Sequence, residues 1–197
     1  DELDEKAKAL AVEQEKLGKN AQRLKELEDM MAAKEATMKK LKETLSKALN
    51  SFEGKGLTIE QKNGKVYVSM ENKLLFSSGS WAVSAEGKNA VVELGKVLGD
   101  NPEIAVLIEG HTDDDAFTAS GPIADNWDLS TKRATSIVGI LSENKKINKQ
   151  NLTAAGRGEF SPLASNETTE GKAKNRRIEI ILTPRLDAIA EMLNEIN

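Results

Sequence analysis

The 197-residue chain contains no cysteine, one histidine, four prolines and few aromatic residues, which make up 4% of the sequence. Without cysteine there is neither a disulfide framework nor a thiol nucleophile, and a single histidine excludes a structural zinc site of the Cys/His type. The lack of cysteine does not indicate a compartment, because it fits an oxidising environment as well as a reducing one. We expect no metal ion and no other cofactor.

The chain also lacks an excess of positive charge and a long apolar run. Its 28 basic and 32 acidic residues leave a net charge of −4, whereas a nucleic-acid-binding protein normally has a basic face. No apolar stretch approaches the roughly 20 residues that span a bilayer. The first residue is Asp1 rather than Met. We therefore expect a soluble segment whose signal peptide, lipid anchor or membrane helix preceded it.

Glycine, proline and aromatic residues are concentrated after the first quarter of the chain. Only one of the 14 glycines and none of the prolines lies within residues 1–50, and the first aromatic residue is Phe52. This change in composition predicts parts with different physical character. The expected parts are a helical coiled-coil stalk at 1–52, a globular domain at 53–184 and a helical tail at 185–197.

Apolar residues of the first segment recur every seven positions, namely at Leu3, Leu10, Leu17, Leu24, Met31, Met38, Leu45 and Phe52. A sustained period of seven predicts a left-handed coiled coil, and at about 1.5 Å per residue the helix would be roughly 75 Å long. The positions three residues further on are mostly polar, so the second apolar row is weak. Two interpretations stay open: a homodimer formed through this helix, and a solvated single helix stabilised by pairs such as Glu15/Lys19.

Strand and helix patterns alternate in the globular segment. Five strands are expected, at residues 57–61, 66–70, 104–108, 152–156 and 177–183. The first two flank an Asn-Gly pair, which is the strongest short signal for a hairpin. Helices with one apolar face are expected at 84–98 and 126–143. This order predicts an α/β sandwich of the β-α-β-α-β type with a mixed sheet.

Charged residues follow the all-apolar strand predicted at 104–108. Asp113 lies at the strand exit, and the helix that begins near Asn126 carries Arg133. A fixed carboxylate and a fixed guanidinium suit a zwitterion such as the α-ammonium and α-carboxylate of an amino acid, and the helix start favours an anionic group. The alternative interpretation is a salt bridge between Asp113 and Arg133 that ties the loop to the helix.

Four segments resemble, in order, the OmpA-like peptidoglycan-binding domain family, which includes the OmpA tails, the Pal lipoproteins and the flagellar stator protein MotB. The segments are Gly110-His111-Thr112-Asp113, Asn126 to Ala134, Gly156-Arg157-Gly158-Glu159 with Pro162, and Asn175 to Ile180. The resemblance covers roughly residues 66–183. It implies a noncatalytic domain that anchors an envelope protein or a membrane to the cell wall by holding the diaminopimelate residue of the peptidoglycan stem peptide.

The resemblance also assigns roles to single residues. It implies that Asp113 binds the ammonium group of diaminopimelate and that Arg133 binds its carboxylate. The further ligand-binding residues that it implies are Thr112, Asn126, Leu129 and Arg177, the last as the second arginine of an Asn-Arg-Arg motif. It finally implies a location in the periplasm, with a tether to the outer membrane or, alternatively, to the inner membrane.

The loop from Asp114 to Asp125 is longer than in the simpler OmpA and Pal pattern. Together with the sequence Asn-Trp-Asp-Leu-Ser that begins at Asn126, it looks more like the MotB branch of the family. Two alternative functions therefore stay open: a MotB-like component of an ion-motor stator, and a structural coiled-coil assembly protein with a cap domain.

Other residues with reactive or aromatic side chains are interpreted as structural. No serine or cysteine lies in a nucleophile motif, so we expect His111 to be a hydrogen-bonded structural histidine rather than a general base. The run Asp113-Asp114-Asp115 lacks the alternating ligand positions and the turn glycine of a calcium-binding loop, so we interpret it as a solvated acidic loop. Trp127 could stack on a sugar ring, although packing at a helix start is more common.

Overall fold

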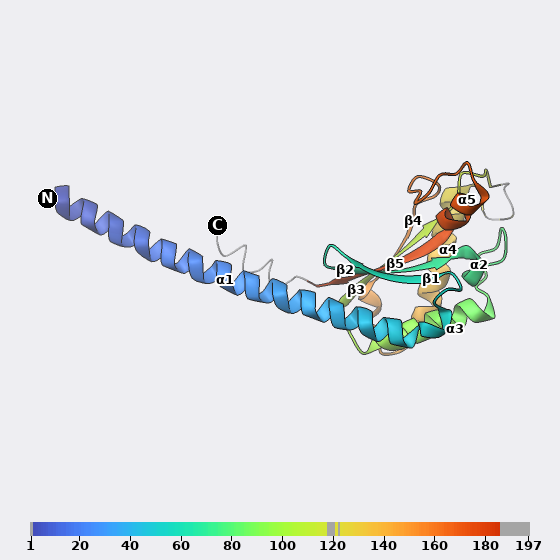
Figure 1. Cartoon of the computed structure of the whole chain (residues 1–197), viewed down its shortest axis with the longest axis horizontal. Coiled ribbons are helices and arrows are strands. Elements are labelled where there is room, and N and C mark those ends of the chain that lie inside the picture. Colours follow the sequence, from blue (N-terminus) through green and yellow to red (C-terminus); the bar gives the residue numbers. More distant parts are fainter. Residues whose placement is uncertain (1, 118–120, 122, 186–197) are drawn as a thin grey trace. The chain divides into compact units, whose positions relative to one another are not determined.

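The computed structural model describes residues 2–117, 121 and 123–185 (Figure 1). The chain divides into two compact units, one from Met38 to Arg185 and another that includes the first helix as far as Thr37. The C-terminal helical tail expected at 185–197 lies, from residue 186 on, outside the described residues. No helix of the described part is both long and apolar enough to cross a membrane.

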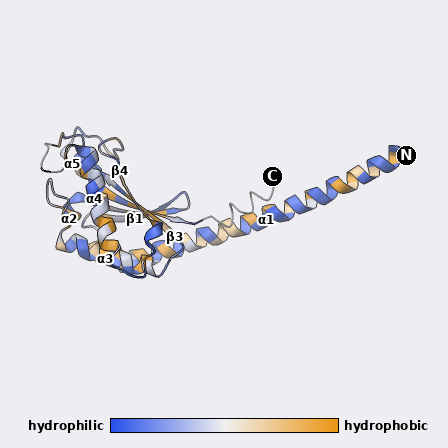
Figure 2. Cartoon of the chain, turned by 180° about the vertical axis from the view of Figure 1, so that it is seen from behind, coloured by the Kyte–Doolittle hydropathy of each residue, from blue (hydrophilic) through white to orange (hydrophobic). Residues whose placement is uncertain are grey.

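The first helix, α1 (Glu2–Ala48), is continuous and confirms the long N-terminal helix predicted from the heptads. Its heptad residues fall into two groups. Those from Leu3 to Met31 are 60–85% exposed, whereas Met38 and Leu45 are fully buried in the unit that begins at Met38. Figure 2 shows apolar and polar residues alternating along this helix. The helix ends at Ala48, and a short 3₁₀ turn (Asn50–Phe52) precedes the first strand.

A five-stranded sheet forms the centre of the second unit. Its strands are β1 (Leu57–Lys62), β2 (Lys65–Glu71), β3 (Ile104–His111), β4 (Leu152–Gly156) and β5 (Arg177–Pro184). Their order in the sheet is β1-β2-β5-β3-β4, and among these pairs only β3 and β4 run parallel. The predicted hairpin is confirmed, because Asn63 and Gly64 between β1 and β2 both have positive φ angles, of 52° and 69°. The mixed sheet is therefore part hairpin and part crossover.

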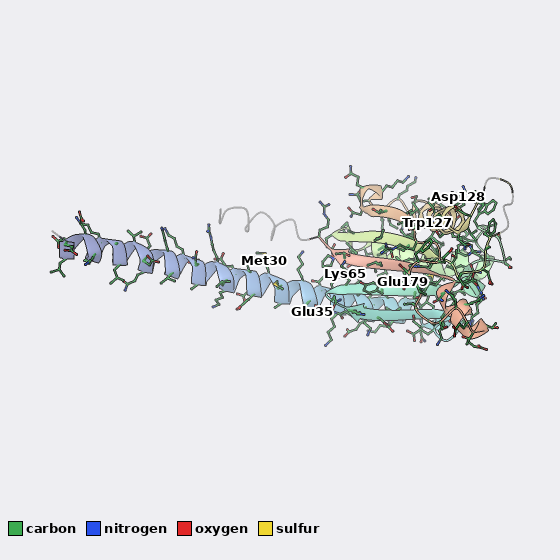
Figure 3. All side chains as sticks on the ribbon, turned by 90° about the horizontal axis from the view of Figure 1, so that it is seen from above. Met30, Glu35, Lys65, Trp127, Asp128 and Glu179 are labelled. Carbon is green, nitrogen blue, oxygen red and sulfur yellow. The ribbon has the colours of Figure 1, made fainter. Side chains whose placement is uncertain are left out.

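In the described part of this unit, four helices follow the first strands: α2 (Asn72–Leu75), α3 (Ala85–Gly99), α4 (Asn126–Leu141) and α5 (Thr169–Asn175). Helices α3 and α4 match the two predicted helices and pack with the last turns of α1 in one apolar core on one side of the sheet (Figure 1). Alternate residues of the central strands point to the other face, on which Figure 3 labels Lys65 and Glu179. The sequence patterns did not predict α2 and α5, because four and seven residues are too few for a helical period to emerge.

Helix α4 approaches the ends of β3 and β4 so closely that glycine is required beneath it. A Cβ atom on Gly110 would lie 2.0 Å from the carbonyl oxygen of Ser130, and one on Gly156 would lie 2.1 Å from Oγ1 of Thr131. Because real Cβ atoms do not approach other atoms so closely, only glycine lets the helix lie this near to the sheet. The close approach holds the first turns of α4 above the carboxyl ends of the two strands.

Candidate functional site

A cavity of about 590 Å³ lies at the carboxyl end of β3, beside α2, α4 and α5. Five of the six predicted ligand residues belong to its wall or its rim: Thr112, Asp113, Asn126, Leu129 and Arg133. Charged side chains of both signs line the cavity, among them Glu71, Lys73 and Arg176. Such a wall suits a ligand that itself carries both charges.

Asp113 forms its ion pair with Arg176 rather than with Arg133. The carboxylate oxygen Oδ2 of Asp113 accepts a hydrogen bond from Nη1 of Arg176, and the Asp113 side chain is only 8% exposed. The second oxygen, Oδ1, accepts no hydrogen bond from the described residues. The predicted alternative of an Asp113–Arg133 salt bridge is therefore wrong for this structure, and one oxygen of a buried carboxylate stays open to the cavity.

Arg133 is buried in the same cavity, at 4% exposure, and makes no ion pair within the described part of the chain. Its Nε donates a hydrogen bond of 2.9 Å to the carbonyl oxygen of Ser80, and its guanidinium carbon lies 5.2 Å from the centre of the Phe76 ring. Burial lowers the pKa of Arg133 to about 10, an effect that Asp113 opposes and Arg176 reinforces. A buried guanidinium with too little negative charge around it favours the binding of an anion.

Asn126 ties the start of α4 to the neighbouring loops. Its Nδ2 donates hydrogen bonds to the backbone oxygen of Asp115 at 3.0 Å and to Oε2 of Glu159 at 2.8 Å. Asp125 caps the helix, because its carboxylate accepts a hydrogen bond from the backbone N–H of Asp128. Part of the donor capacity of the helix start is therefore already used within the chain.

The acidic run after Asp113 is held by a lysine of α5. Nζ of Lys172 lies 3.3 Å from Asp114 and 2.5 Å from Asp115, and the hydrogen bond to Asp115 is the main cause that raises the pKa of the lysine. Both carboxylates are at least half exposed. The run thus fastens one rim of the cavity to α5.

Arg177 lies outside the cavity, on the opposite face of the sheet. It is the first residue of β5, and its Nε donates a hydrogen bond of 2.8 Å to Glu179 on the same face. Neighbouring residues point to opposite sides here, so the adjacent Arg176 faces the cavity while Arg177 turns away from it. The sequence analysis selected Arg177, the second arginine of the motif, and missed Arg176, the first. Only the residue at which β5 begins determines which of the two points towards the cavity.

His111 is buried beside two carboxylates on the same face as Arg177. Neither ring nitrogen has a hydrogen-bond partner among the described residues, contrary to the expected hydrogen-bonded histidine; Nε2 lies 3.6 Å from Glu109 and 4.0 Å from Glu179. These three side chains have the composition of a metal site. However, Arg157 pairs with Glu109 at 3.2 Å and Arg177 pairs with Glu179, so two arginines already balance the charge of the carboxylates and no metal ion is required for this. We assign this group to the structure rather than to a ligand.

The environment of His111 predicts a dependence of stability on pH. Burial, together with the charges of Arg177 and Arg157, lowers the pKa of His111 from 6.5 to about 3. Between pH 6.5 and pH 3, His111 is protonated in the unfolded chain but stays neutral in the folded chain. Its contribution to the free energy of unfolding is therefore complete above pH 6.5 and decreases as the pH falls towards 3. We expect His111 to account for a loss of about 3 kcal/mol by pH 4.5.

Urea unfolding at pH 7.0, 5.5 and 4.5 measures this effect. The free energy of unfolding of His111→Gln should fall less steeply with decreasing pH than that of the wild type, since the substituted side chain cannot take up a proton. Equal slopes for the two proteins would show that His111 contributes no such effect.

Two exposed aromatic rings lie near the cavity, at the start of α4 and in the loop after β4. The Trp127 and Phe160 rings are stacked, with centroids 5.2 Å apart and planes inclined by 24°. Their exposed fractions are 49% and 64%. Trp127 therefore packs at the helix start, as expected of such a tryptophan, but against another exposed ring rather than into the core.

The comparison with known proteins agrees with this fold. Residues 75–176, more than half of the chain, match the OmpA family, and the chain belongs to that family. A MotB-like protein of Desulfovibrio vulgaris has a similar structure, with a TM-score of 0.72, 25% sequence identity and coverage of 81% of this chain and 99% of that one. The cell wall anchor of the T6SS from Pseudomonas aeruginosa is also similar, with a TM-score of 0.65 and 27% identity over 72% of this chain and 97% of that one.

Two curated relatives extend the likeness to sequence. Motility protein B of Bacillus subtilis is 36% identical over 118 residues, which are 60% of this chain and 45% of that protein. Probable lipoprotein YiaD of Escherichia coli is 32% identical over 139 residues, which are 71% of this chain and 61% of that protein. The chain thus spans about half the length of these relatives, which by name are a motility protein and a probable lipoprotein.

Proposed function

We propose that the chain binds peptidoglycan without catalysis, by holding the diaminopimelate residue of the stem peptide in the cavity at the end of β3. The observation that carries the proposal is that one cavity contains two buried charged groups of opposite sign whose binding capacity is not fully used. Among the described residues, Arg133 is buried without an ion pair, and Asp113 is buried with one carboxylate oxygen that accepts no hydrogen bond. Diaminopimelate offers the complementary groups, because its side chain ends in an ammonium and a carboxylate on one carbon.

Binding consists of two charge-assisted contacts. The ligand carboxylate approaches the terminal nitrogens of Arg133, which the hydrogen bond from Nε to Ser80 leaves available. The ligand ammonium approaches Oδ1 of Asp113, whose other oxygen is fixed by Arg176. Because Arg176 and Asp113 are already paired, the aspartate is held in place before the ligand arrives, which lowers the entropy lost on binding.

The proposed ligand-binding set differs from the sequence prediction at one position. Arg176 lines the cavity and orients Asp113, whereas Arg177 lies on the other face of the sheet. The remaining proposed residues are Thr112, Asp113, Asn126, Leu129 and Arg133. The buried hydroxyl of Thr112 has no hydrogen-bond partner among the described residues and is a further donor for the ligand.

A noncatalytic role is supported by the chemistry of the cavity wall. The hydroxyl groups that line it belong to Ser78 and Thr112, and within the described residues neither is hydrogen-bonded to a histidine or a carboxylate. The acidic side chains Glu71, Asp113 and Asp115 each form an ion pair with a lysine or an arginine. Charge pairing of this kind recognises a ligand but does not activate a nucleophile.

The proposed location is the periplasm, with a tether to the outer membrane or, as the alternative, to the inner membrane. A second candidate function is the wall anchor of a MotB-like ion-motor stator, which is favoured by the 36% identity to Motility protein B. Both candidates require the same wall contact. Loss of motility in a strain that lacks the gene would favour the stator, whereas normal motility with a loosened envelope would favour the outer-membrane tether.

Co-sedimentation with purified sacculi tests the proposal. The wild-type protein should pellet with sacculi whose stem peptides contain diaminopimelate and should be released by excess free diaminopimelate peptide. Sacculi that carry lysine in its place are the matched control, because lysine lacks the second carboxylate and should retain much less protein. Equal retention on both kinds of sacculi, or none on either, would contradict the proposal.

We also propose that α1 forms a parallel homodimer through its exposed heptad residues. Apolar side chains from Leu3 to Met31 are exposed at intervals of seven, whereas the next two in the series are buried. A second copy of α1 would bury the exposed stripe. Replacing Leu10, Leu17 and Leu24 by serine should convert a dimer into a monomer in sedimentation equilibrium, while replacing Lys8 and Lys25 by serine should not. A monomeric wild type at all concentrations would contradict this proposal.

A further inference from the structure

The stacked pair of Trp127 and Phe160 forms an exposed apolar surface that is not part of the cavity wall. About half or more of each side chain is exposed, although each ring is covered on one side by the other. Single apolar side chains are commonly exposed on protein surfaces. Two aromatic rings that stack on each other and both stay exposed are less common and indicate a binding surface.

The chain holds this pair rigidly. Gly158 has a positive φ of 54°, and a Cβ built on it would lie 3.4 Å from the Phe160 ring and 3.6 Å from the Trp127 ring, so the turn lies directly beneath both. The backbone N–H of Gly158 donates a hydrogen bond to Oγ of Ser130 in α4. The rings therefore rest on a turn that is fastened to the first turns of α4.

Hydrogen bonds connect the same turn to the cavity. The carbonyl oxygen of Gly158 accepts a hydrogen bond of 2.9 Å from the backbone N–H of Thr112, which lines the cavity. Asn126, another lining residue, donates to Glu159, the residue before Phe160. Trp127 follows Asn126 directly, so their Cα atoms are about 3.8 Å apart. The aromatic pair thus flanks the cavity on the side of α4, where Figure 3 labels Trp127 and Asp128.

We propose that the Trp127–Phe160 pair is a subsite for an N-acetylated pyranose ring of the glycan strand, next to the peptide-binding cavity. The inference rests on the proposed function. A pyranose presents C–H groups on its faces and polar groups at its edge, so its faces suit an exposed aromatic surface. Diaminopimelate is the third residue of the stem, so an extended chain of about 10 Å or more joins it to the sugar and can reach a subsite that flanks the cavity.

The size of the surface also favours a sugar over a protein partner. An aromatic side chain offers about 150–250 Å² of surface, so two half-exposed rings fall well below the roughly 800 Å² per partner of a stable protein interface. One or two sugar rings cover such an area.

Titration calorimetry with two ligands tests the subsite: a diaminopimelate-containing stem peptide alone, and the same peptide joined to its disaccharide. The wild type should bind the disaccharide-peptide about threefold to tenfold more tightly than the peptide. Trp127→Ala and Phe160→Ala should abolish this advantage and leave the affinity for the free peptide within about twofold of the wild type. Trp127→Tyr should keep most of the advantage, since it keeps an aromatic ring.

Leu163→Ala is the matched control, because Leu163 is apolar, 63% exposed and in the same loop as Phe160, but carries no ring. It should leave the advantage unchanged. No advantage in the wild type, or an unchanged advantage in Trp127→Ala, would overturn the subsite and leave the proposed peptide binding intact. If the wild type does not bind the free peptide, the proposed function fails and the subsite fails with it.

Discussion

Arg133→Gln should bind a diaminopimelate-containing peptide roughly 30- to 1,000-fold more weakly than the wild type. The substitution removes the guanidinium that the ligand carboxylate requires. Because Arg133 is only 4% exposed, the carboxylate is then left unpaired at a largely buried position. Truncating one partner of a buried charge pair costs about 2–4 kcal/mol, which corresponds to this range of affinities. Titration calorimetry measures the loss directly.

The stability of Arg133→Gln distinguishes lost binding from lost folding. Arg133 is buried, forms no ion pair with any described residue, and has a pKa that burial lowers, so its charge is disfavoured there. Removing this charge should therefore leave the free energy of unfolding unchanged or raise it, as expected of a residue kept for function. Lys132→Gln is the matched control: Lys132 precedes Arg133 on α4 but is exposed, so its loss should barely change the affinity. Similar losses of affinity in both variants would point to a general effect of charge.

Gly110→Ala should destabilise the fold by about 3 kcal/mol or more. The new Cβ would lie 2.0 Å from the carbonyl oxygen of Ser130, and backbone atoms on both sides leave neither partner room to move. Relief requires α4 to lift from the sheet, which breaks core contacts over much of the helix. The lifted helix would also displace Arg133, so the ligand affinity should fall together with the stability.

Gly139→Ala supplies the comparison on the same helix. No described residue lies within 4 Å of a Cβ on Gly139, and alanine is favoured over glycine in the interior of a helix. This variant should gain about 0.5–1 kcal/mol, measured by urea unfolding beside Gly110→Ala. If the two variants changed stability in the same direction, the close approach of α4 to the sheet would not be the cause.

The long elements of the fold could be predicted from sequence because their patterns are long. Seven-residue spacing predicted α1, an Asn-Gly pair predicted the β1–β2 hairpin, and an all-apolar run predicted β3. The short helices α2 and α5 carry no readable period. They form because tertiary contacts hold them, and both line the cavity. The sequence therefore predicted the framework of the site better than its walls.

The contacts among the charged residues of the site could likewise not be predicted from the sequence. A resemblance to a family selects the Asn-Arg-Arg segment, but which arginine faces the cavity depends on where β5 begins, and a shift by one residue exchanges the two faces. The partner of Asp113 is Arg176, more than 60 residues away along the chain, and no spacing in the sequence indicates that contact. Local patterns predict which residues are available; the packing of the sheet decides which of them meet.

The most direct test of the account is the ratio of two dissociation constants for the wild-type protein, one for a stem peptide with diaminopimelate and one for the same peptide with lysine. The two ligands differ only in the carboxylate that Arg133 is proposed to bind. The account predicts that the diaminopimelate peptide binds at least about tenfold more tightly, and that the ratio falls to near one in Arg133→Gln. Equal affinities of the wild type for both peptides would contradict the proposed recognition of diaminopimelate.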